Sequence, residues 1–466
     1  MRTLIVLIVL LALGAGAAWY VSGRAAVPVI EIAEPTKVIG QSGDLAVNVD
    51  TPGGELIRLD IAIEQGGKRT TVFSLDGGAD IAKLSREGDD RLRVTGKIGR
   101  AEIPAIEEGP LRILVTAVRP VLFGYRQLES SAQHDIKVRL VPPQVSVQSA
   151  FHYINLGGSE LVVYRVTPSD AISGVRVGPY EYPGFPASGA GVAGADPSLR
   201  VAFFAVLWDQ DVKTPISVYA RDEVGNESVA SFDYRIFPKT FRKSRIEVDD
   251  RFLARVVPAI LQNTPELKVD NAADLPGSYI RINRELRRMN NATITELARR
   301  TSPQMLWQGV FKQLGNTAVE AGFADQRTYV YKGEDVDHQV HLGFDLASTS
   351  NAPVEAANDG KVLHAGWLGI YGNCVILDHG MGLLSLYAHL SSIEVAMGAS
   401  VKKNDRLGRS GTTGLAGGDH LHFTMLLGGN AITPVDWWSE KWVQDRVMRK
   451  LRDAGTSAAQ SATAAQ

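Results

Sequence analysis

Hydrophobic and polar residues alternate along the N-terminal third of the chain. In "ELIRLDIAIEQ" (55–65) apolar side chains recur at every second position, and "DIKVRLVPP" (135–143) repeats the pattern. Successive side chains of a β-strand point to opposite faces, so this period predicts strands with one buried face. Turn signals such as "TPGGE" and "EQGGK" separate the runs. We therefore expect a β-sandwich domain over residues 26–142, with core positions that include Ile57, Leu59, Ile61, Ile63, Ile136, Val138 and Leu140.

A second β-rich stretch follows "VPP" and extends over residues 143–240. Its last part, "PISVYARDEVGNESVASFDYRIFP", resembles the closing hairpin of bacterial immunoglobulin-like domains, in which Asp-x-x-Gly-Asn makes the turn. The resemblance implies a second immunoglobulin-like domain, of a kind that commonly serves as a spacer or docking module. The sequence "GAGVAG" (189–194) satisfies the dinucleotide-binding pattern, but no strand precedes it and no helix follows, so we interpret it as a loop.

Between residues 241 and 325 the hydrophobic period becomes helical. Asp249 and Asp250 are expected to begin a helix that Pro258 kinks, and "TITE" (293–296) fits a capping box for another. The basic stretch "RINRELRR" (281–288) predicts a solvated helix face, or alternatively a contact with an anionic wall polymer or lipid headgroups. Glycine-punctuated β pattern returns over 326–440, and a C-terminal helix with a disordered tail is expected over 441–466.

The first 25 residues predict a membrane segment. Leu4 to Val21 form an uncharged run of 18 residues between two arginines, the shortest length expected to span a bilayer as a helix. The small residues at 14–18 resemble a signal-peptide cleavage region, whereas Trp19 and Tyr20 fit the interfacial end of a retained anchor. In both interpretations the bulk of the chain is exported. If the segment is retained as an anchor, the chain is expected at the periplasmic face of an inner membrane.

Charge and cysteine content narrow the function classes. The 466 residues carry 49 Lys and Arg against 51 Asp and Glu, so nothing in the composition favours nucleic acid as a partner. The single cysteine, Cys374, excludes an intrachain disulfide framework and a cysteine-rich metal cluster. Any transition-metal site in this chain must therefore use histidine and carboxylate ligands.

Histidines gather in the C-terminal β region, where seven of the nine lie between 338 and 422. His341 and Asp345 are expected on one strand face with Gly343 between them, while His420 and His422 converge only if "GGDHLHFTM" is extended. His389 ends the apolar run "SLYAHLSS". A catalytic zinc uses three nitrogen and oxygen ligands and keeps one position open, so this set exceeds one site and leaves two groups for proton transfer or oxyanion stabilisation.

A family resemblance assigns the roles. The segment from "HLGFDLA" through "YGNCVILDHGMGLLSLYAHLS" to "GRSGTTGLAGGDHLHF" resembles the lysostaphin and LytM-type zinc endopeptidases of peptidoglycan, over a domain at 326–440. The resemblance implies that the metal ligands are His341, Asp345 and His422 and that the catalytic histidines are His389 and His420. In the alternative interpretation, His389 and His420 support the metal ligands and take no part in proton transfer. One residue departs from the family pattern: Asp419 stands where proline is frequent.

The expected protein is therefore multidomain and mainly β: a membrane helix, two immunoglobulin-like sandwiches, a helical linker and an antiparallel β metallopeptidase domain. The expected function is zinc-dependent hydrolysis of peptidoglycan peptides, cross-links or stems, through a metal-activated water. The alternative is a non-enzymatic, wall-binding activator of cell-wall amidases; histidine and carboxylate ligands also accept other divalent ions. We expect His338 to be a surface residue, and His364 and His379 to be structural or solvated.

Overall fold

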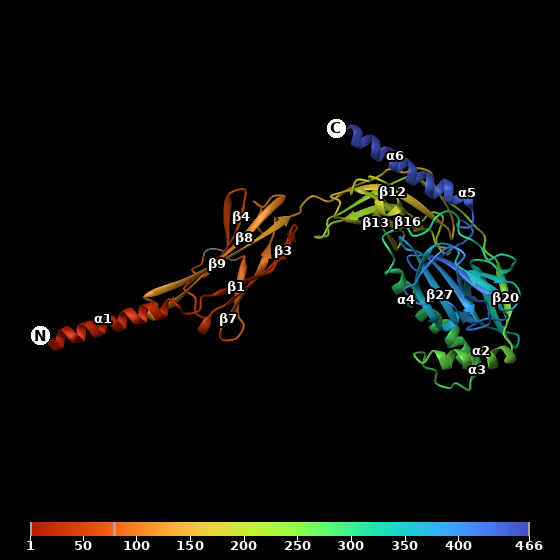
Figure 1. Cartoon of the computed structure of the whole chain (residues 1–466), viewed down its shortest axis with the longest axis horizontal. Coiled ribbons are helices and arrows are strands. Elements are labelled where there is room, and N and C mark those ends of the chain that lie inside the picture. Colours follow the sequence, from red (N-terminus) through yellow and green to blue (C-terminus); the bar gives the residue numbers. More distant parts are fainter. Residues whose placement is uncertain (1, 78–80, 465–466) are drawn as a thin grey trace. The chain divides into compact units, whose positions relative to one another are not determined.

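The computed structural model describes residues 2–77 and 81–464 and is mainly β, with few helices (Figure 1). The chain divides into two compact units: Met1–Pro143 together with Arg221–Glu227, and Gln144–Ala220 together with Ser228–Gln466. The predicted mainly β, multidomain class is confirmed.

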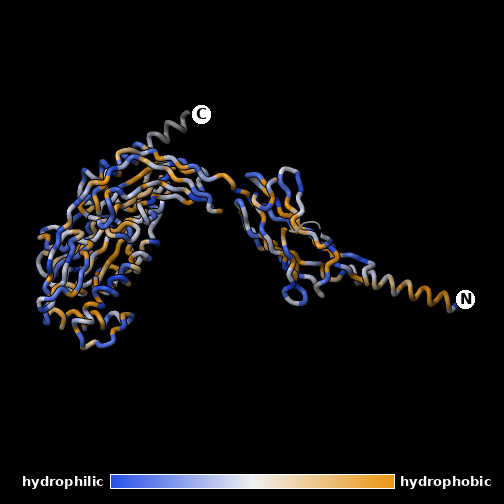
Figure 2. The backbone as a smooth tube through the Cα atoms, turned by 180° about the vertical axis from the view of Figure 1, so that it is seen from behind, coloured by the Kyte–Doolittle hydropathy of each residue, from blue (hydrophilic) through white to orange (hydrophobic). Residues whose placement is uncertain are grey.

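Helix α1 (Arg2–Ser22) begins the described chain. Figure 2 shows hydrophobic residues along its length, and its mean hydropathy is 2.5 with none of it buried. A helix of 21 residues is about 30 Å long, which matches the hydrocarbon core of a bilayer. By length and composition, α1 is the one described helix that is apolar enough to cross a membrane.

The rest of the first unit is the predicted β-sandwich. A four-stranded sheet and a five-stranded sheet enclose one apolar core, in which Leu59, Ile61 and Ile63 are buried. Ile57, which the alternation predicts in the core, is 41% exposed and lies one residue before the strand that contains Leu59. The strand therefore begins one residue later than the sequence pattern predicts. In sheet order the strands are β1 (Val29–Glu34), β3 (Gly43–Asp50), β7 (Arg91–Ile98), β6 (Ala82–Arg86); and β2 (Val38–Ile39), β9 (Arg126–Val138), β8 (Gly109–Val121), β4 (Arg58–Gln65), β5 (Lys68–Ser74).

The second β region also consists of two four-stranded sheets, with a parallel strand pair beside them. In its closing hairpin the Asp222 carboxylate accepts hydrogen bonds from the amides of Val224 and Asn226, and Gly225 has φ +87°. "GAGVAG" is a 3₁₀ turn and loop. The strands are β10 (Gln144–Val147), β12 (Ser159–Thr167), β16 (Leu199–Ala205), β15 (Phe185–Pro186); β14 (Tyr180–Pro183), β13 (Ile172–Val177), β17 (Ile216–Arg221), β18 (Glu227–Ser231); and β11 (His152–Asn155) with β19 (Tyr234–Phe237).

The helical segment begins as the sequence predicts but continues differently. Asp249 caps α2 (Asp250–Asn263) by accepting a hydrogen bond from the Phe252 amide at 2.7 Å. The capping box at "TITE" is wrong, because α3 (Leu275–Arg281), the π-helical turn Ile282–Leu286 and α4 (Arg287–Ala298) follow one another without a break. Thr293 therefore lies inside α4, and its hydroxyl donates to the Met289 carbonyl at 3.1 Å.

The basic stretch 281–288 is not a purely solvated face. Arg284 pairs at 2.7 Å with Asp337, whose side chain is 2% exposed, and Arg287 donates to the Asn283 side chain at 2.6 Å. Arg284 holds the helical segment against strand β23 (Glu334–His341), which carries the first candidate ligand, whereas the Arg287 contact lies within the helical segment.

The C-terminal region contains an eight-stranded antiparallel sheet, seen around β27 in Figure 1. Its order is β21 (Ala318–Ala321), β24 (Phe344–Ala347), β32 (Leu421–Leu427), β28 (Leu383–Leu390), β27 (Asn373–Gly380), β26 (Gly360–Trp367) and β30 (Ser400–Val401), with β33 (Asn430–Ile432) on β32. Two three-stranded sheets accompany it: β20 (Lys243–Glu247), β22 (Asp325–Tyr331), β23; and β25 (Pro353–Glu355), β31 (Arg406–Arg409), β29 (Ser392–Ile393).

The end of the chain returns to the second β region. After α5 (Glu440–Trp442) and the π-helical turn Val443–Met448, helix α6 (Arg449–Ala464) runs beside β12 (Figure 1). Lys450 forms a buried ion pair with Glu160 at 2.9 Å, and one apolar core spans the second β region and the eight-stranded sheet. Helix α6 extends over much of the tail expected to be disordered, in keeping with the high helix propensity of its alanines; residues 465–466 of that tail lie outside the described residues.

Candidate metal centre

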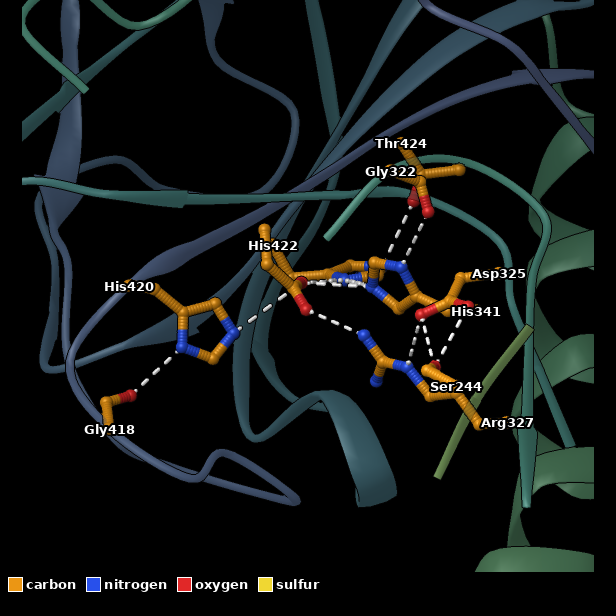
Figure 3. A network of polar contacts seen from close by, with 10 residues as sticks. Ser244, Gly322, Asp325, Arg327, His341, Gly418, His420, His422 and Thr424 are labelled. Carbon is orange, nitrogen blue, oxygen red and sulfur yellow. Dashed lines mark hydrogen bonds and ion pairs between the residues drawn. The ribbon is translucent and has the colours of Figure 1, made fainter. Parts of the chain in front are cut away.

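Three side chains converge from three strands. His341 ends β23, Asp345 lies in β24, and His422 lies in β32 directly opposite Asp345. Asp345 Oδ1 is 2.9 Å from both His341 Nε2 and His422 Nδ1, and those two nitrogens are 3.0 Å apart (Figure 3). The three predicted ligands thus place one donor atom each around a common point.

The outer nitrogens fix which atom of each imidazole carries the proton. His341 Nδ1 lies 3.1 Å from the Gly322 carbonyl, which only accepts, so this nitrogen is the donor. The Thr424 hydroxyl donates to the Leu342 carbonyl at 3.0 Å and therefore accepts from His422 Nε2 at 3.0 Å. The inner nitrogens of His341 and His422 then present lone pairs to each other and to a carboxylate.

Such a trio fits a divalent metal ion. Three lone-pair donors at about hydrogen-bond distance, with no proton between them, repel one another unless a cation lies at their centre. Two histidine nitrogens and one carboxylate oxygen form a donor set typical of a catalytic zinc, and histidine ligands typically donate their outer N–H to a carbonyl or other acceptor. The residues present therefore fit the implied ion.

A glycine permits this convergence. The sequence predicts His341 and Asp345 on one strand, but β23 ends at His341 and β24 begins at Phe344, with Gly343 at the break. A Cβ at Gly343 would lie 2.6 Å from His422 Nε2 and 2.5 Å from Thr424 Oγ1. The missing side chain lets the break pass close to the His422 ring.

The electrostatics keep Asp345 ionised. Burial disfavours its charged form, but His341, His420 and His422 outweigh burial and hold the pKa of Asp345 well below its usual range. Burial lowers the pKa of His422 to about 4 despite the neighbouring carboxylate. An ionised carboxylate and a neutral imidazole are the forms that bind a metal.

His389 and His420 lie on the same cavity but outside the ligand trio. His389 Nδ1 donates to the Thr413 carbonyl at 2.8 Å and His420 Nδ1 to the Gly418 carbonyl at 2.9 Å, which leaves Nε2 of each ring for the cavity. Their ring centroids are 4.9 Å apart, and His420 Nε2 is 3.5 Å from Asp345 Oδ1. His389 has φ +62°, an uncommon conformation for a residue with a side chain and one that clusters at functional sites.

The two histidines differ in protonation. Burial, followed by His420 and His422, lowers the pKa of His389 well below its usual value. Burial also disfavours the His420 cation, but hydrogen bonding and charge from Asp345 outweigh it and raise the pKa of His420. Without an ion at the trio, the pKa values of the two rings thus shift in opposite directions.

The helical segment forms part of the cavity. The volume is about 350 Å³, and its lining includes Val248, Phe252 and Tyr279 from the segment between β20 and α3. Arg255 of α2 donates to the carbonyls of Ala416 and Gly417 at 2.9 and 3.1 Å and so holds the loop that precedes His420. This wall comes from outside the region that carries the histidines.

Asp419, the departure from the family pattern, also fixes this loop. Its Oδ1 accepts from the Ser410 hydroxyl at 2.6 Å, and its Oδ2 accepts from the Asn351 amide at 3.0 Å. An anchored carboxylate here fixes the backbone just before His420, where a proline would restrict it through its ring.

The remaining histidines have structural surroundings. His338 is exposed and contacts the Thr328 hydroxyl at 3.2 Å, while His379 is fully buried between the Asp359 carbonyl and the Ser385 hydroxyl. His364 contacts the Gly366 carbonyl at 3.2 Å, and Cys374 is buried in the core.

Two contributors were not found from the sequence. Thr424, which accepts a hydrogen bond from His422, stands two residues after it on the same strand face. The alternation of side chains along a strand could therefore have identified Thr424 as a neighbour of His422. Arg327, which donates to Asp345 Oδ2 at 3.1 Å, lies on another strand with no spacing that links it to the motif.

Comparison with known proteins identifies the family of this region. Residues 339–434 match Peptidase family M23. The DD-carboxypeptidase/endopeptidase Mpg of Neisseria meningitidis serogroup B is 38% identical over 97 residues, which are 21% of this chain and 22% of that protein. The murein hydrolase activator EnvC of Escherichia coli K12 is 33% identical over 95 residues, 20% of this chain and 23% of that protein.

The catalytic domain of lysostaphin from Staphylococcus simulans is 27% identical and covers 28% of this chain and 98% of its own, with a TM-score of 0.25. The chain spans about a fifth of the length of the curated relatives it matches. The C-terminal region thus contains a Peptidase family M23 domain, which confirms the family resemblance of the sequence.

Proposed function

We propose that this chain is a zinc-dependent endopeptidase that hydrolyses peptide bonds of bacterial peptidoglycan. The observation that carries the proposal is the trio His341, Asp345 and His422, whose inner donor atoms all present lone pairs to one point. The M23 match supports peptide hydrolysis, and the relative named as a DD-carboxypeptidase/endopeptidase supports cross-links or stem peptides as substrates.

The roles of the residues follow from their chemistry. His341, Asp345 and His422 would hold a divalent ion, which would supply a Lewis acid to polarise the scissile carbonyl and acidify water. His389, whose Nδ1 donates to the Thr413 carbonyl, would accept a proton from water at Nε2. His420, whose Nε2 lies 3.5 Å from Asp345 Oδ1 and faces the cavity, would donate from that nitrogen to the oxygen on which negative charge develops.

The N-terminal half of the chain bears on where in the cell the enzyme is located. Helix α1 fits a membrane anchor, so we propose an exported protein at the periplasmic face of the inner membrane, with peptidoglycan as its partner. The two β regions would then serve as spacers between the membrane and the wall. This part of the proposal predicts that wall cleavage in cells falls when residues 28–142 are deleted.

The second candidate is a non-enzymatic activator of wall amidases, which the similarity to the activator EnvC favours. An activator has no need of three metal donors and two further histidines around one cavity. The complete donor set therefore favours the enzyme.

The test incubates the full chain, purified in detergent, with defined cross-linked muropeptides, with and without added zinc. Products are identified by mass spectrometry for wild type, His341→Ala and His420→Ala, with His338→Ala as a matched control on the same strand as His341. We expect zinc-dependent cleavage by wild type and His338→Ala, metal loss in His341→Ala, and retained metal without turnover in His420→Ala. Stoichiometric zinc without cleavage by wild type would overturn the enzyme and favour the activator.

A further inference from the structure

A chain of polar contacts runs from Ser244 through Asp325 and Arg327 to the carboxylate of Asp345 (Figure 3). The Ser244 hydroxyl lies 2.8 and 2.7 Å from the two carboxylate oxygens of Asp325. Arg327 contacts Asp325 Oδ2 through Nε at 3.5 Å and donates from Nη2 to Asp345 Oδ2 at 3.1 Å. Three strands supply this chain: β20 gives Ser244, β22 gives both Asp325 and Arg327, and β24 gives Asp345.

These charged groups are nearly removed from water. The exposed fractions of the side chains are 3% for Asp325, 18% for Arg327 and 12% for Asp345. Desolvation disfavours the Arg327 cation, but Asp345 and Tyr329 together outweigh it and raise the pKa of Arg327. A guanidinium buried at this cost between two carboxylates holds a fixed position, because each contact it gives up leaves a charge unpaired.

The two oxygens of Asp345 are therefore used differently. Oδ1 faces His341 and His422, at 2.9 Å from each, whereas Oδ2 accepts from Arg327. We propose that Arg327 is a positioning residue of the metal centre, which occupies Asp345 Oδ2 so that only Oδ1 is offered to the ion. The inference rests on the proposed function for its catalytic consequence, but its structural content concerns metal binding alone.

The consequence for the ion is electronic. A carboxylate that contributes one oxygen and shares its charge with a guanidinium donates less electron density than a free carboxylate that contributes two. Arg327 thereby keeps the ion a stronger Lewis acid and keeps its remaining positions for water and substrate.

Arg327 also lines the cavity, so a direct contact with substrate is the competing role. The two roles separate in kinetics and in spectroscopy. A substrate contact made equally in the ground and transition states appears in KM, whereas a change in the metal centre appears in kcat and in the spectrum of the metal.

The test replaces Arg327 with methionine in the full chain, loads wild type and variant with cobalt(II), and compares their visible spectra before any substrate is added. We expect the visible bands to change in position and intensity, because Asp345 is free to offer its second oxygen. With zinc and cross-linked muropeptides, we expect kcat to fall about 10–100-fold, the usual cost of removing such a support, with KM unchanged.

Two further variants guard the interpretation. Arg245→Met is the matched control, because Arg245 lies in the same small sheet and pairs with Asp335 at 2.6 Å through side chains that are 59% and 45% exposed. We expect its spectrum and kinetics to match wild type. Should Arg327→Met fail to fold because Asp325 is left unpaired, Arg327→Met combined with Asp325→Asn removes both charges and answers the same question.

The outcomes separate the two proposals. A cobalt spectrum of the variant that superimposes on wild type, with kcat unchanged, overturns the positioning role of Arg327. A rise in KM alone also overturns it, in favour of substrate contact. A third outcome is that the cobalt spectrum of Arg327→Met differs from that of wild type, while wild type binds metal but does not cleave peptide. This outcome supports the positioning role of Arg327 and overturns the proposed function.

Discussion

Asp345 and His422 lie directly opposite each other on β24 and β32, and their atoms Oδ1 and Nδ1 are 2.9 Å apart. Strand pairing fixes this distance, because residues in register across an antiparallel ladder have their Cβ atoms about 5 Å apart on the same face. The ligand pair is therefore built into the sheet, and the contacts around it decide how well it binds.

Thr424→Val is expected to weaken metal binding without unfolding the protein. Valine keeps the shape of threonine but removes the oxygen that accepts from His422 Nε2, so the His422 tautomer is no longer fixed. We expect zinc affinity to fall about 10–100-fold, measured by competition with a chelator of known affinity. Thr328→Val, on the exposed Thr328–His338 contact, is the control and should bind zinc as wild type does. Equal affinity for Thr424→Val would remove the tautomer argument.

Gly343→Ala is expected to abolish metal binding. The added Cβ would lie 2.6 Å from His422 Nε2, closer than real contacts allow, so β24 or the His422 ring must move. We expect a loss of bound zinc, measured by atomic absorption, and a lower Tm. Gly315→Ala is the matched control, because its Cβ meets nothing within 4 Å and its φ is not positive. Stoichiometric zinc in Gly343→Ala would contradict the need for a bare backbone here.

The buried His379 is expected to make stability depend on pH. Burial lowers its pKa from 6.5 to about 4, so the folded protein keeps the neutral ring, whereas the unfolded chain binds a proton more readily. The stabilisation is complete above pH 6.5 and is lost as the pH falls toward about 4, by at most about 3 kcal/mol.

The measurement follows thermal unfolding by tryptophan fluorescence between pH 7 and pH 4. Six of the seven tryptophans lie beyond residue 143, so this signal reports on the second unit. His379→Gln keeps partners for the Asp359 carbonyl and the Ser385 hydroxyl but does not titrate. We expect a shallower loss of Tm with falling pH in this variant, and parallel curves would refute the assignment to His379.

The buried pair Lys450–Glu160 is expected to hold α6 against the second β region. Lys450→Met leaves Glu160, which is 0% exposed, without its cation and should cost about 3–5 kcal/mol. The double change Lys450→Met and Glu160→Gln removes both charges and should restore most of that stability. Thermal unfolding of both variants measures this difference. As a control, Arg449→Met, on the exposed Arg449–Asp445 pair at 4.0 Å, should leave Tm nearly unchanged. A double change as unstable as the single one would show that packing, not charge pairing, holds the helix.

The sequence by itself determined the β class and the apolar N-terminal helix, and it predicted five candidate site residues. A period of two in "ELIRLDIAIEQ" reflects a backbone geometry that holds in any strand. The motifs that contain His341, Asp345, His389, His420 and His422 could be predicted as a site because their order along the chain resembles that of a known family. The cap at Asp249 was predictable for the same reason, because it depends on a residue and the amide three positions later.

Only the tertiary structure decided which groups support that site. Arg327 of β22 reaches Asp345 of β24 although the two strands belong to different sheets, and Arg255 holds the loop before His420 from a helix more than 150 residues earlier. The predicted capping box at "TITE" is wrong because helix α4 continues through these residues. The Lys450–Glu160 pair forms because α6 returns to β12. Local pattern fixes the geometry of neighbours in sequence, whereas contacts between distant segments depend on how strands pair and cores merge, which no local spacing encodes.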